Sequence, residues 1–226
     1  IKEEIGDKRG MGYSLNSIGI VHNNKGDLDT ALDYYTRSLA IQEELGDKRG
    51  MGYSLNNIGL VHSNKGDYDK ALDFHGRSLA IKEEIGDKLG MGNSLHNIGI
   101  VHHAKGDYDK ALDYYDRSLA IAEELGNKGG MGRILNNIGI VYGNKGDVGK
   151  ALDYYSRSLA ITEELGNKGL MGTVLNNIGL ECLIKGDYGR ALDYYGRSLA
   201  IAEELGHKGL MGTTLSGIGH MHWNKG

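Results

Sequence analysis

IQEELGDKRGMGYSLNNIGLVHSNKGDYDKALDFHGRSLA occupies residues 41–80, and closely similar stretches fill the rest of the 226-residue chain. The tripeptide Ala71-Leu72-Asp73 recurs every 40 residues without an insertion. Such a period is typical of repeat proteins in which each repeat is one supersecondary unit. We therefore expect a single repeat domain over residues 1–226, made of five full copies and one partial copy: 1–40, 41–80, 81–120, 121–160, 161–200 and 201–226.

The second copy predicts two helices joined by a short turn. One apolar stripe has the helical spacing i, i+4, i+7, i+11 and consists of Met51, Leu55, Ile58 and His62. It predicts a helix A over about 49–64. In the turn that follows, Gly66 can adopt the left-handed conformation and the Asp67 carboxylate can cap the next helix. Gly86 ends that second helix in the same way.

The second helix, helix B, spans about 68–85 and carries two apolar stripes, so we expect it to be covered on two sides. The stripes are Tyr68, Ala71, Leu72, His75 and Leu79, and Phe74, Ser78, Ile81 and Ile85. A position between its own helix A and helix A of the next copy meets this requirement. The predicted fold class is all-α: an α-solenoid of stacked antiparallel helix pairs.

Glycine is unusually abundant, with 37 residues, whereas proline is absent. Gly59 and its counterparts are interpreted as points of close packing between helices A and B. Gly12, Gly52 and Gly92 lie within helix A, where each glycine costs about 0.5–1 kcal/mol relative to alanine. We therefore expect alanine at these three positions to raise the melting temperature.

The repeat resembles the tetratricopeptide repeat over the whole chain. The resemblance rests on Leu55, Ile58-Gly59, His62, Gly66, Tyr68, Ala71, His75 and Leu79, which match the W-x2-L-G-x2-Y, G-x-Y, A-x3-F and late Leu positions of that family. The 40-residue length is most similar to repeats of bacterial regulatory proteins and of Pins-type adaptors. The chain departs from the family by having Leu for the first Trp, His for Tyr in four copies, and no closing Pro. The resemblance implies a right-handed superhelix whose concave wall is formed by helices A.

The helical wheel places a polar arc opposite the apolar stripe of helix A, and the resemblance assigns this arc to the concave groove. Its residues at positions 13 and 23 of the repeat change from copy to copy, as selective recognition requires, although neutral drift at exposed positions gives the same pattern. We predict that an extended peptide or a helix of a partner protein binds here. The predicted contacts are Tyr13, Asn16, Tyr53, Asn56, Asn57, Leu60, Asn64, Asn93, His96, Asn97, Ile100, His103, Arg133, Asn136, Asn137, Ile140, Asn144, Thr173, Asn176 and Asn177.

Two interpretations of the asparagines in this arc remain open. Side-chain amides both donate and accept, so a column of them can pair with any peptide backbone, which resembles the asparagine ladder of O-GlcNAc transferase. Alternatively, the amides hydrogen-bond between neighbouring repeats. The two-carboxylate clamp of the family needs Lys or Arg beside such asparagines, and Arg133 is the one such residue on the arc. The sequence therefore does not favour a receptor for chaperone tails.

No motif predicts an enzyme, a metal site or a cofactor. Four histidines fall on the apolar stripe of helix A, one per copy: His22, His62, His102 and, in the partial copy, His222. They are interpreted as core residues. Consecutive acidic residues such as Glu43 and Glu44 diverge on a helix and are repeated, which is typical of a solvated face. The single cysteine, Cys182, takes the same stripe position and is expected to be buried.

Charge and length limit the partners. A formal net charge of −4 does not favour nucleic acid or an anionic membrane, and no apolar run is long enough for a membrane span. A cytoplasmic location is the prediction, and the missing initiator Met indicates a piece of a longer protein.

The last helix A exposes an uncapped stripe: Met211, Leu215, Ile218 and His222. The alternative function is therefore end-to-end self-association as a structural solenoid.

Overall fold

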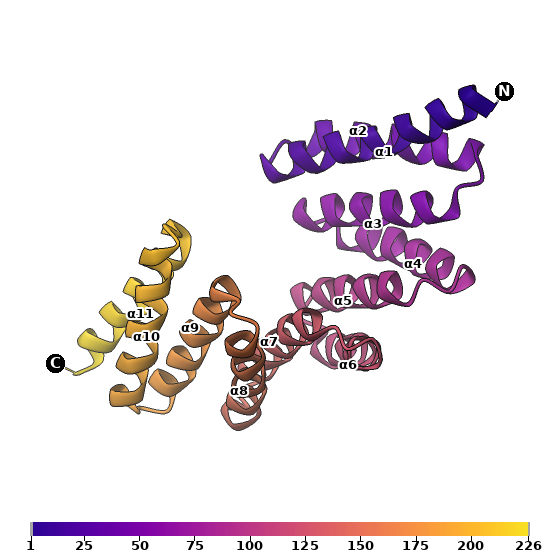
Figure 1. Ribbon diagram of the computed structural model, residues 1–226. Helices are drawn as coiled ribbons and strands as arrows, with labels where there is room; N and C mark the ends of the chain where they lie inside the picture. The colour runs from indigo at the N-terminus through magenta and orange to yellow at the C-terminus, as the bar shows by residue number, and fades with distance from the viewer. Residues whose placement is uncertain (1, 226) are drawn as a thin grey trace. The chain divides into compact units, whose positions relative to one another are not determined.

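The computed structural model describes the backbone of residues 2–225 and the side chains of residues 8–221. His222 and Trp223, named or implied by the repeat pattern, lie outside the described side chains. Residues 2–225 form eleven helices in sequential antiparallel pairs (Figure 1), which confirms the all-α prediction. Their bounds are α1 Lys2–Asn24, α2 Leu28–Glu44, α3 Lys48–Asn64, α4 Tyr68–Glu84, α5 Lys88–Ala104, α6 Tyr108–Glu124, α7 Lys128–Asn144, α8 Val148–Glu164, α9 Lys168–Ile184, α10 Tyr188–Glu204 and α11 Lys208–Lys225.

The chain forms two compact units, residues 1–121 and 122–226, which are described separately. In the first unit α3 contacts α1 and α5 directly, α2 packs against α1 and α3, and α4 packs against α3 and α5. In the second unit α9 contacts α7 and α11 in the same way, with α8 and α10 against them. We call α1, α3, α5, α7, α9 and α11 the A helices, and the others the B helices. The predicted placement of helix B between two A helices is confirmed, whereas a single domain over the whole chain stays a prediction.

The turns follow the predicted chemistry with one exception. Gly66 and Gly86 have φ of 79° and 68°, and a glycine with positive φ ends each of the first ten helices. The Asp47 carboxylate caps α3 by accepting from Gly50 N at 3.2 Å. Asp67 stands at the corresponding place before α4, but its side chain makes no capping bond. Its carboxylate lies 3.3 Å from Nδ1 of His62 instead, so the expected cap was wrong at this residue.

Close packing at the conserved helix A glycine is confirmed in all five full copies. A Cβ added at Gly139 would lie 2.6 Å from Cε1 of Tyr155, and one at Gly59 would lie 2.7 Å from Cε1 of His75. Both distances are shorter than non-bonded carbons tolerate. Gly219 in the partial copy differs, because a Cβ there would meet nothing within 4 Å. The glycine therefore marks where a ring of the following B helix lies on helix A.

The mid-helix glycines leave different amounts of room for alanine. A Cβ at Gly12 would lie 3.5 Å from Cγ2 of Ile41, and one at Gly52 would lie 3.4 Å from Lys82, which are ordinary contacts. At Gly92 the nearest atom, Cγ2 of Ile121, would be 3.3 Å away, so the neighbour must move slightly. The expected rise in melting temperature from alanine is therefore carried by Gly12 and Gly52 more than by Gly92.

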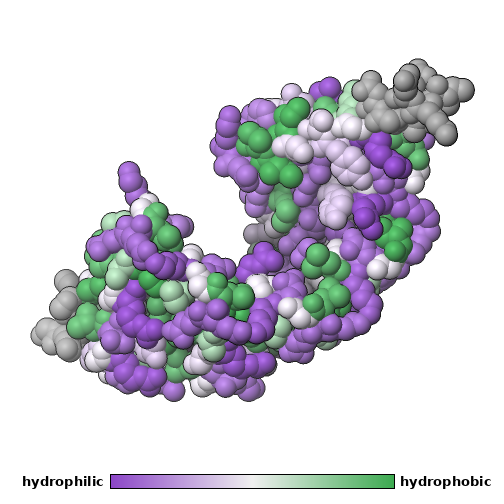
Figure 2. Space-filling view, in the orientation of Figure 1, coloured by the Kyte–Doolittle hydropathy of each residue, from purple (hydrophilic) through white to green (hydrophobic). Residues whose placement is uncertain are grey.

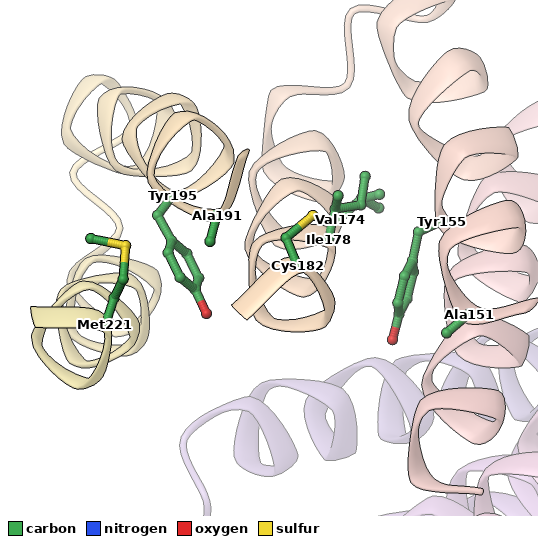
Figure 3. Close-up of a cluster of buried hydrophobic side chains, with 8 residues drawn as sticks. All are labelled: Ala151, Tyr155, Val174, Ile178, Cys182, Ala191, Tyr195 and Met221. Atoms are coloured by element: carbon green, nitrogen blue, oxygen red, sulfur yellow. The ribbon is translucent and has the colours of Figure 1, made fainter. Parts of the chain in front are cut away.

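The core consists of rings and aliphatic side chains held between the layers. Figure 3 shows Val174, Ile178 and Cys182 of α9 between Tyr155 of α8 and Tyr195 of α10, with Met221 of α11 beyond. Cys182 is buried, as predicted from its place on the stripe.

Buried hydroxyl groups join the two helices of each copy, and some also reach a hydroxyl of the next copy, as Ser38 reaches Ser54 at 3.1 Å. Ser38 Oγ donates to the carbonyl oxygen of Gly12 at 2.7 Å, and the same bond recurs from Ser78, Ser118, Ser158 and Ser198. The residue one helical turn later is also buried and changes along the B helices, reading Gln42 on α2, Lys82 on α4, Ala122 on α6, Thr162 on α8 and Ala202 on α10. The chemistry between repeats therefore changes along the chain even where the backbone is repeated.

Candidate functional site

The predicted arc of helix A forms an exposed stripe in the structure. On α3 the exposed or half-buried residues follow the spacing i, i+3, i+7, i+11 through Tyr53, Asn56, Leu60 and Asn64. The opposite side, with Leu55 and Ile58, is buried. Because α3 contacts α1 and α5 directly, stripes of neighbouring A helices lie next to one another within the first unit.

All predicted contact residues except one retain solvent exposure. Tyr13, Tyr53, Asn64, Asn93, Arg133 and Asn144 are exposed. Asn16, Asn56, Asn57, Leu60, His96, Asn97, Ile100, His103, Asn137, Ile140, Thr173, Asn176 and Asn177 are half-buried. Asn136 alone is buried, with 5% of its surface exposed. The arrangement brings the predicted residues onto a common face in each unit, while their role in binding stays a prediction.

The asparagines hydrogen-bond between neighbouring repeats. Asn57 Nδ2 donates to Asn16 Oδ1 at 2.9 Å, and Asn97 Nδ2 donates to Asn56 Oδ1 at 3.0 Å. In the second unit Asn177 Nδ2 donates to Asn136 Oδ1 at 3.0 Å. Hydrogen bonding between neighbouring repeats, one of the two predicted uses of these asparagines, is therefore present.

The asparagine side chains can form further hydrogen bonds besides these. A carboxamide can donate two hydrogen bonds and accept two, so one inter-repeat bond leaves capacity on the exposed side of each half-buried group. The inter-repeat bond also fixes the orientation of the amide before any ligand arrives. Packing between repeats and binding of a peptide backbone are thus compatible uses of the same side chains.

The first unit carries tyrosines at the variable position 13 of the repeat, and each lies near a buried polar group. The Tyr13 hydroxyl donates to Asp47 at 3.1 Å, and burial together with the Asp47 carboxylate raises the pKa of Tyr13. The Tyr53 ring, which is 44% exposed, lies 5.8 Å from Nζ of Lys82. Lys82 was missed by the sequence analysis because it belongs to helix B, whereas the arc was drawn on helix A alone.

The same stripe is more aliphatic in the second unit. Leu180 and Ile184 of α9 are exposed, and Ile140 and Leu183 are half-buried beside them. Arg133, one repeat earlier on α7, is exposed. In Figure 2, apolar residues form separate green patches among hydrophilic residues. The two units therefore present different side chains on one repeated backbone.

Of the stripe histidines predicted to be core residues, His62 and His102 are buried, whereas His22 is half-buried. The rings of His62 and His102 stack on aromatic rings of helix B, Phe74 and Tyr114. Among the side chains of residues 8–221, no group of three or more His, Cys, Asp or Glu residues is arranged to hold a metal ion. Within the described part of the chain, every helix is too short or too polar to span a membrane.

Solved structures with the same arrangement of helices are known at low sequence identity. BtubC (BKLC) from P. vanneervenii is 19% identical, with a TM-score of 0.76 over 91% of this chain and 89% of that one. A Rap protein complexed with Competence and Sporulation Factor is 17% identical, with a TM-score of 0.81 over 90% of this chain and 57% of the Rap chain. A Podosopora anserina putative kinesin light chain with nearly identical TPR-like repeats is 15% identical, with a TM-score of 0.67 over 85% and 95% of the two chains. These likenesses show the fold, and the chain spans little more than half of the Rap protein.

Family membership follows from sequence models. None of the curated protein sequences matches the chain. The tetratricopeptide repeat model matches four overlapping segments, residues 10–84, 50–124, 90–164 and 130–204. These matches cover most of the residues that form the helix pairs and the exposed stripes, so the chain belongs to the tetratricopeptide repeat family.

Proposed function

We propose that this chain is a non-catalytic scaffold that binds an extended polypeptide of a partner protein along the exposed stripes of its A helices. Tetratricopeptide repeats generally mediate protein interactions, and one structural neighbour, the Rap protein, is seen in complex with Competence and Sporulation Factor. The observation that carries the proposal is the line of oriented, half-buried amides. Asn16, Asn57, Asn56 and Asn97 provide it in the first unit.

The chemistry of this line suits a peptide backbone. Backbone N–H and C=O groups need acceptors and donors irrespective of sequence, and carboxamides supply both. Beside the amides, Leu60 and Ile100 provide half-buried apolar surface for ligand side chains. The residues at position 13, Tyr53, Asn93 and Arg133, differ in size and charge and would select among ligands.

Substitution of the amides tests this function. A peptide is first selected from a random peptide library, then labelled and titrated by fluorescence anisotropy. We expect Asn97→Ala and Asn137→Ala each to raise the Kd about fivefold, because one net hydrogen bond contributes about 1 kcal/mol. The far-ultraviolet circular dichroism should keep the helical signal of the unsubstituted chain.

Thr36→Ala and Ser156→Ala are matched controls on the exposed side of B helices, where each hydroxyl bonds within its own helix. They should leave the Kd unchanged. If the asparagine variants unfold at 25 °C, or if they bind as tightly as the controls, the asparagines serve packing alone and the proposed binding face is wrong.

End-to-end association is the second candidate, because residues buried inside the repeats are exposed at both ends. Val21 is 51% exposed, whereas its counterpart Val61 is fully buried. Leu215 is 51% exposed, whereas Leu175 is 1% exposed. Met211 and Ile218 of the predicted terminal stripe are half-buried. Light scattering that finds a mass rising with concentration would favour this function, and a constant mass would favour the peptide scaffold.

A further inference from the structure

Lys82 of α4 is a buried ammonium group. Only 2% of its surface is exposed, although lysine is rarely buried without a counter-ion. The corresponding residues in the other copies, Gln42, Ala122, Thr162 and Ala202, are all uncharged. The repeat fold therefore does not require a charge at this place, and Lys82 calls for a separate explanation.

The hydrogen bonds around Lys82 have a defined direction. The Ser78 hydroxyl donates its proton to the carbonyl oxygen of Gly52 at 2.7 Å, so it can only accept from Ser94, whose oxygen lies 3.2 Å away. The Ser94 hydroxyl then accepts from Lys82 Nζ at 2.9 Å. Among the described residues, Ser94 Oγ is the one hydrogen-bond acceptor that Nζ reaches. Two of the three ammonium protons are left for another group.

The positive charge of Lys82 has little compensation from negative groups nearby. Burial lowers the pKa of Lys82 to about 8, and the Asp87 carboxylate opposes this shift without reaching hydrogen-bond distance. The group therefore still carries its charge at neutral pH. Gln42 at the same place on α2 bonds to both neighbouring hydroxyls, since it donates to Ser38 at 3.0 Å and accepts from Ser54 at 2.7 Å.

Lys82 contacts a residue of the predicted binding face. Nζ is 5.8 Å from the centre of the Tyr53 ring, and Tyr53 is an exposed residue of the α3 stripe. Arg49, one helical turn before Tyr53, is also exposed and adds positive charge. The Tyr53 ring therefore links the buried ammonium to the exposed stripe. An anionic group is the complement to this charge.

We propose that Lys82, covered by Tyr53 in the unbound chain, forms a subsite for the carboxylate of an Asp or Glu side chain in the bound polypeptide. This inference rests on the proposed function. A side chain, instead of a terminal carboxylate, is favoured because stripe residues lie on both sides of the subsite: Asn16 on α1 and Asn97 on α5. A polypeptide held by both would pass Lys82 in mid-segment.

The test compares peptides selected by the unsubstituted chain and by Lys82→Gln from one random library. The glutamine variant should fold, because Gln42 occupies the same place on α2. We expect Asp or Glu to be enriched at one position of the peptides bound by the unsubstituted chain and not of those bound by Lys82→Gln. Lys70→Gln removes the same charge from an exposed position of α4 and should keep the enrichment.

Synthetic peptides then give the size of the effect. Changing the enriched Asp or Glu to Asn or Gln should raise the Kd at least tenfold with the unsubstituted chain and less than twofold with Lys82→Gln, as expected for a charge-assisted hydrogen bond. Amidation of the peptide C-terminus should leave the Kd unchanged. A large loss on amidation would overturn the side-chain assignment, and equal losses with both proteins would overturn the role of Lys82.

The two proposals fail in different ways. If no peptide binds to the unsubstituted chain, the proposed function is wrong. If peptides bind and asparagine substitutions weaken them, but no acidic residue is enriched, the proposed function stands and the Lys82 subsite is wrong.

Discussion

Gly139→Ala is expected to destabilise the chain by about 1–3 kcal/mol, despite the higher helix propensity of alanine. The added Cβ would lie 2.6 Å from Cε1 of Tyr155, and Cδ1 of the same ring would be 2.7 Å away. The ring cannot retreat easily, since Tyr155 is 3% exposed and packs in the core of the second unit. Either the helices separate or the ring leaves its rotamer. Urea unfolding followed by circular dichroism measures the change.

Gly132→Ala in the same helix is the matched control. A Cβ there would meet Ile161, Leu170 and Thr162 at 3.5–3.6 Å, which is ordinary van der Waals contact. Alanine should therefore stabilise α7 by about 0.5–1 kcal/mol through its helix propensity alone. The expected result is that Gly139→Ala lowers the free energy of unfolding, whereas Gly132→Ala, seven residues away, raises it. A gain in stability from Gly139→Ala would contradict the packing role assigned to this glycine.

His75→Tyr is expected to stabilise the chain by about 1–3 kcal/mol at neutral pH. His75 is fully buried, and both ring nitrogens lack a hydrogen-bond partner among the described residues. A buried polar group without a partner costs about 1–3 kcal/mol. Tyrosine occupies this slot in the other full copies, at Tyr35, Tyr115, Tyr155 and Tyr195. Each packs against the helix A glycine as His75 does against Gly59.

The same substitution should remove a dependence of stability on pH. Burial, and to a lesser extent the charge of Lys82, lowers the pKa of His75 to about 4 from an ordinary 6.5. Between these values the unfolded chain binds the proton and the folded chain does not. This contribution to stability is therefore complete above pH 6.5 and falls by about 3 kcal/mol as the pH drops to about 4.

Urea unfolding of both proteins at pH 7.5 and at pH 4.5 checks the two effects together. The stability difference between His75→Tyr and the unsubstituted chain should be larger at the lower pH. A difference that does not change with pH would mean that the pKa of His75 is the same in the folded and the unfolded chain, contrary to the effect of its burial.

Much of the fold could be predicted because the repeat shows each element several times. The expected limits of helices A and B in the second copy agree with α3 and α4 to within one residue. Gly66 and Gly86 have the left-handed backbone that their places demanded. The capping role of Asp67 was wrong, since an N-cap motif specifies a position and not a rotamer. The contact with His62 does not by itself explain the difference, because Asp27 lies beside His22 in the same way and still caps its helix.

The candidate site could be predicted in outline and not in its chemistry. Helical periodicity identified the exposed stripe of helix A, because residues three or four apart on a helix share one face and hence one degree of solvent exposure. It could not identify Lys82, because contacts between helices join residues that are distant in the repeat: Nζ reaches Tyr53 and Ser94 from two different A helices. It also could not decide between the two uses of the asparagines, because hydrogen bonds between repeats depend on the offset of adjacent helices.

The most direct test of the central claim is the spectrum of the asparagine side-chain amides, recorded by nuclear magnetic resonance while a selected peptide is added. If the A helices bind the peptide backbone, the side-chain NH2 signals of Asn57, Asn97 and Asn177 shift on binding, and in the Asn97→Ala variant the remaining signals of Asn57 and Asn177 shift only at higher peptide concentrations. Unchanged side-chain amide signals on addition of the peptide, together with backbone amide shifts of Val21 and Leu215 that grow with protein concentration, would contradict the account and leave end-to-end association in its place.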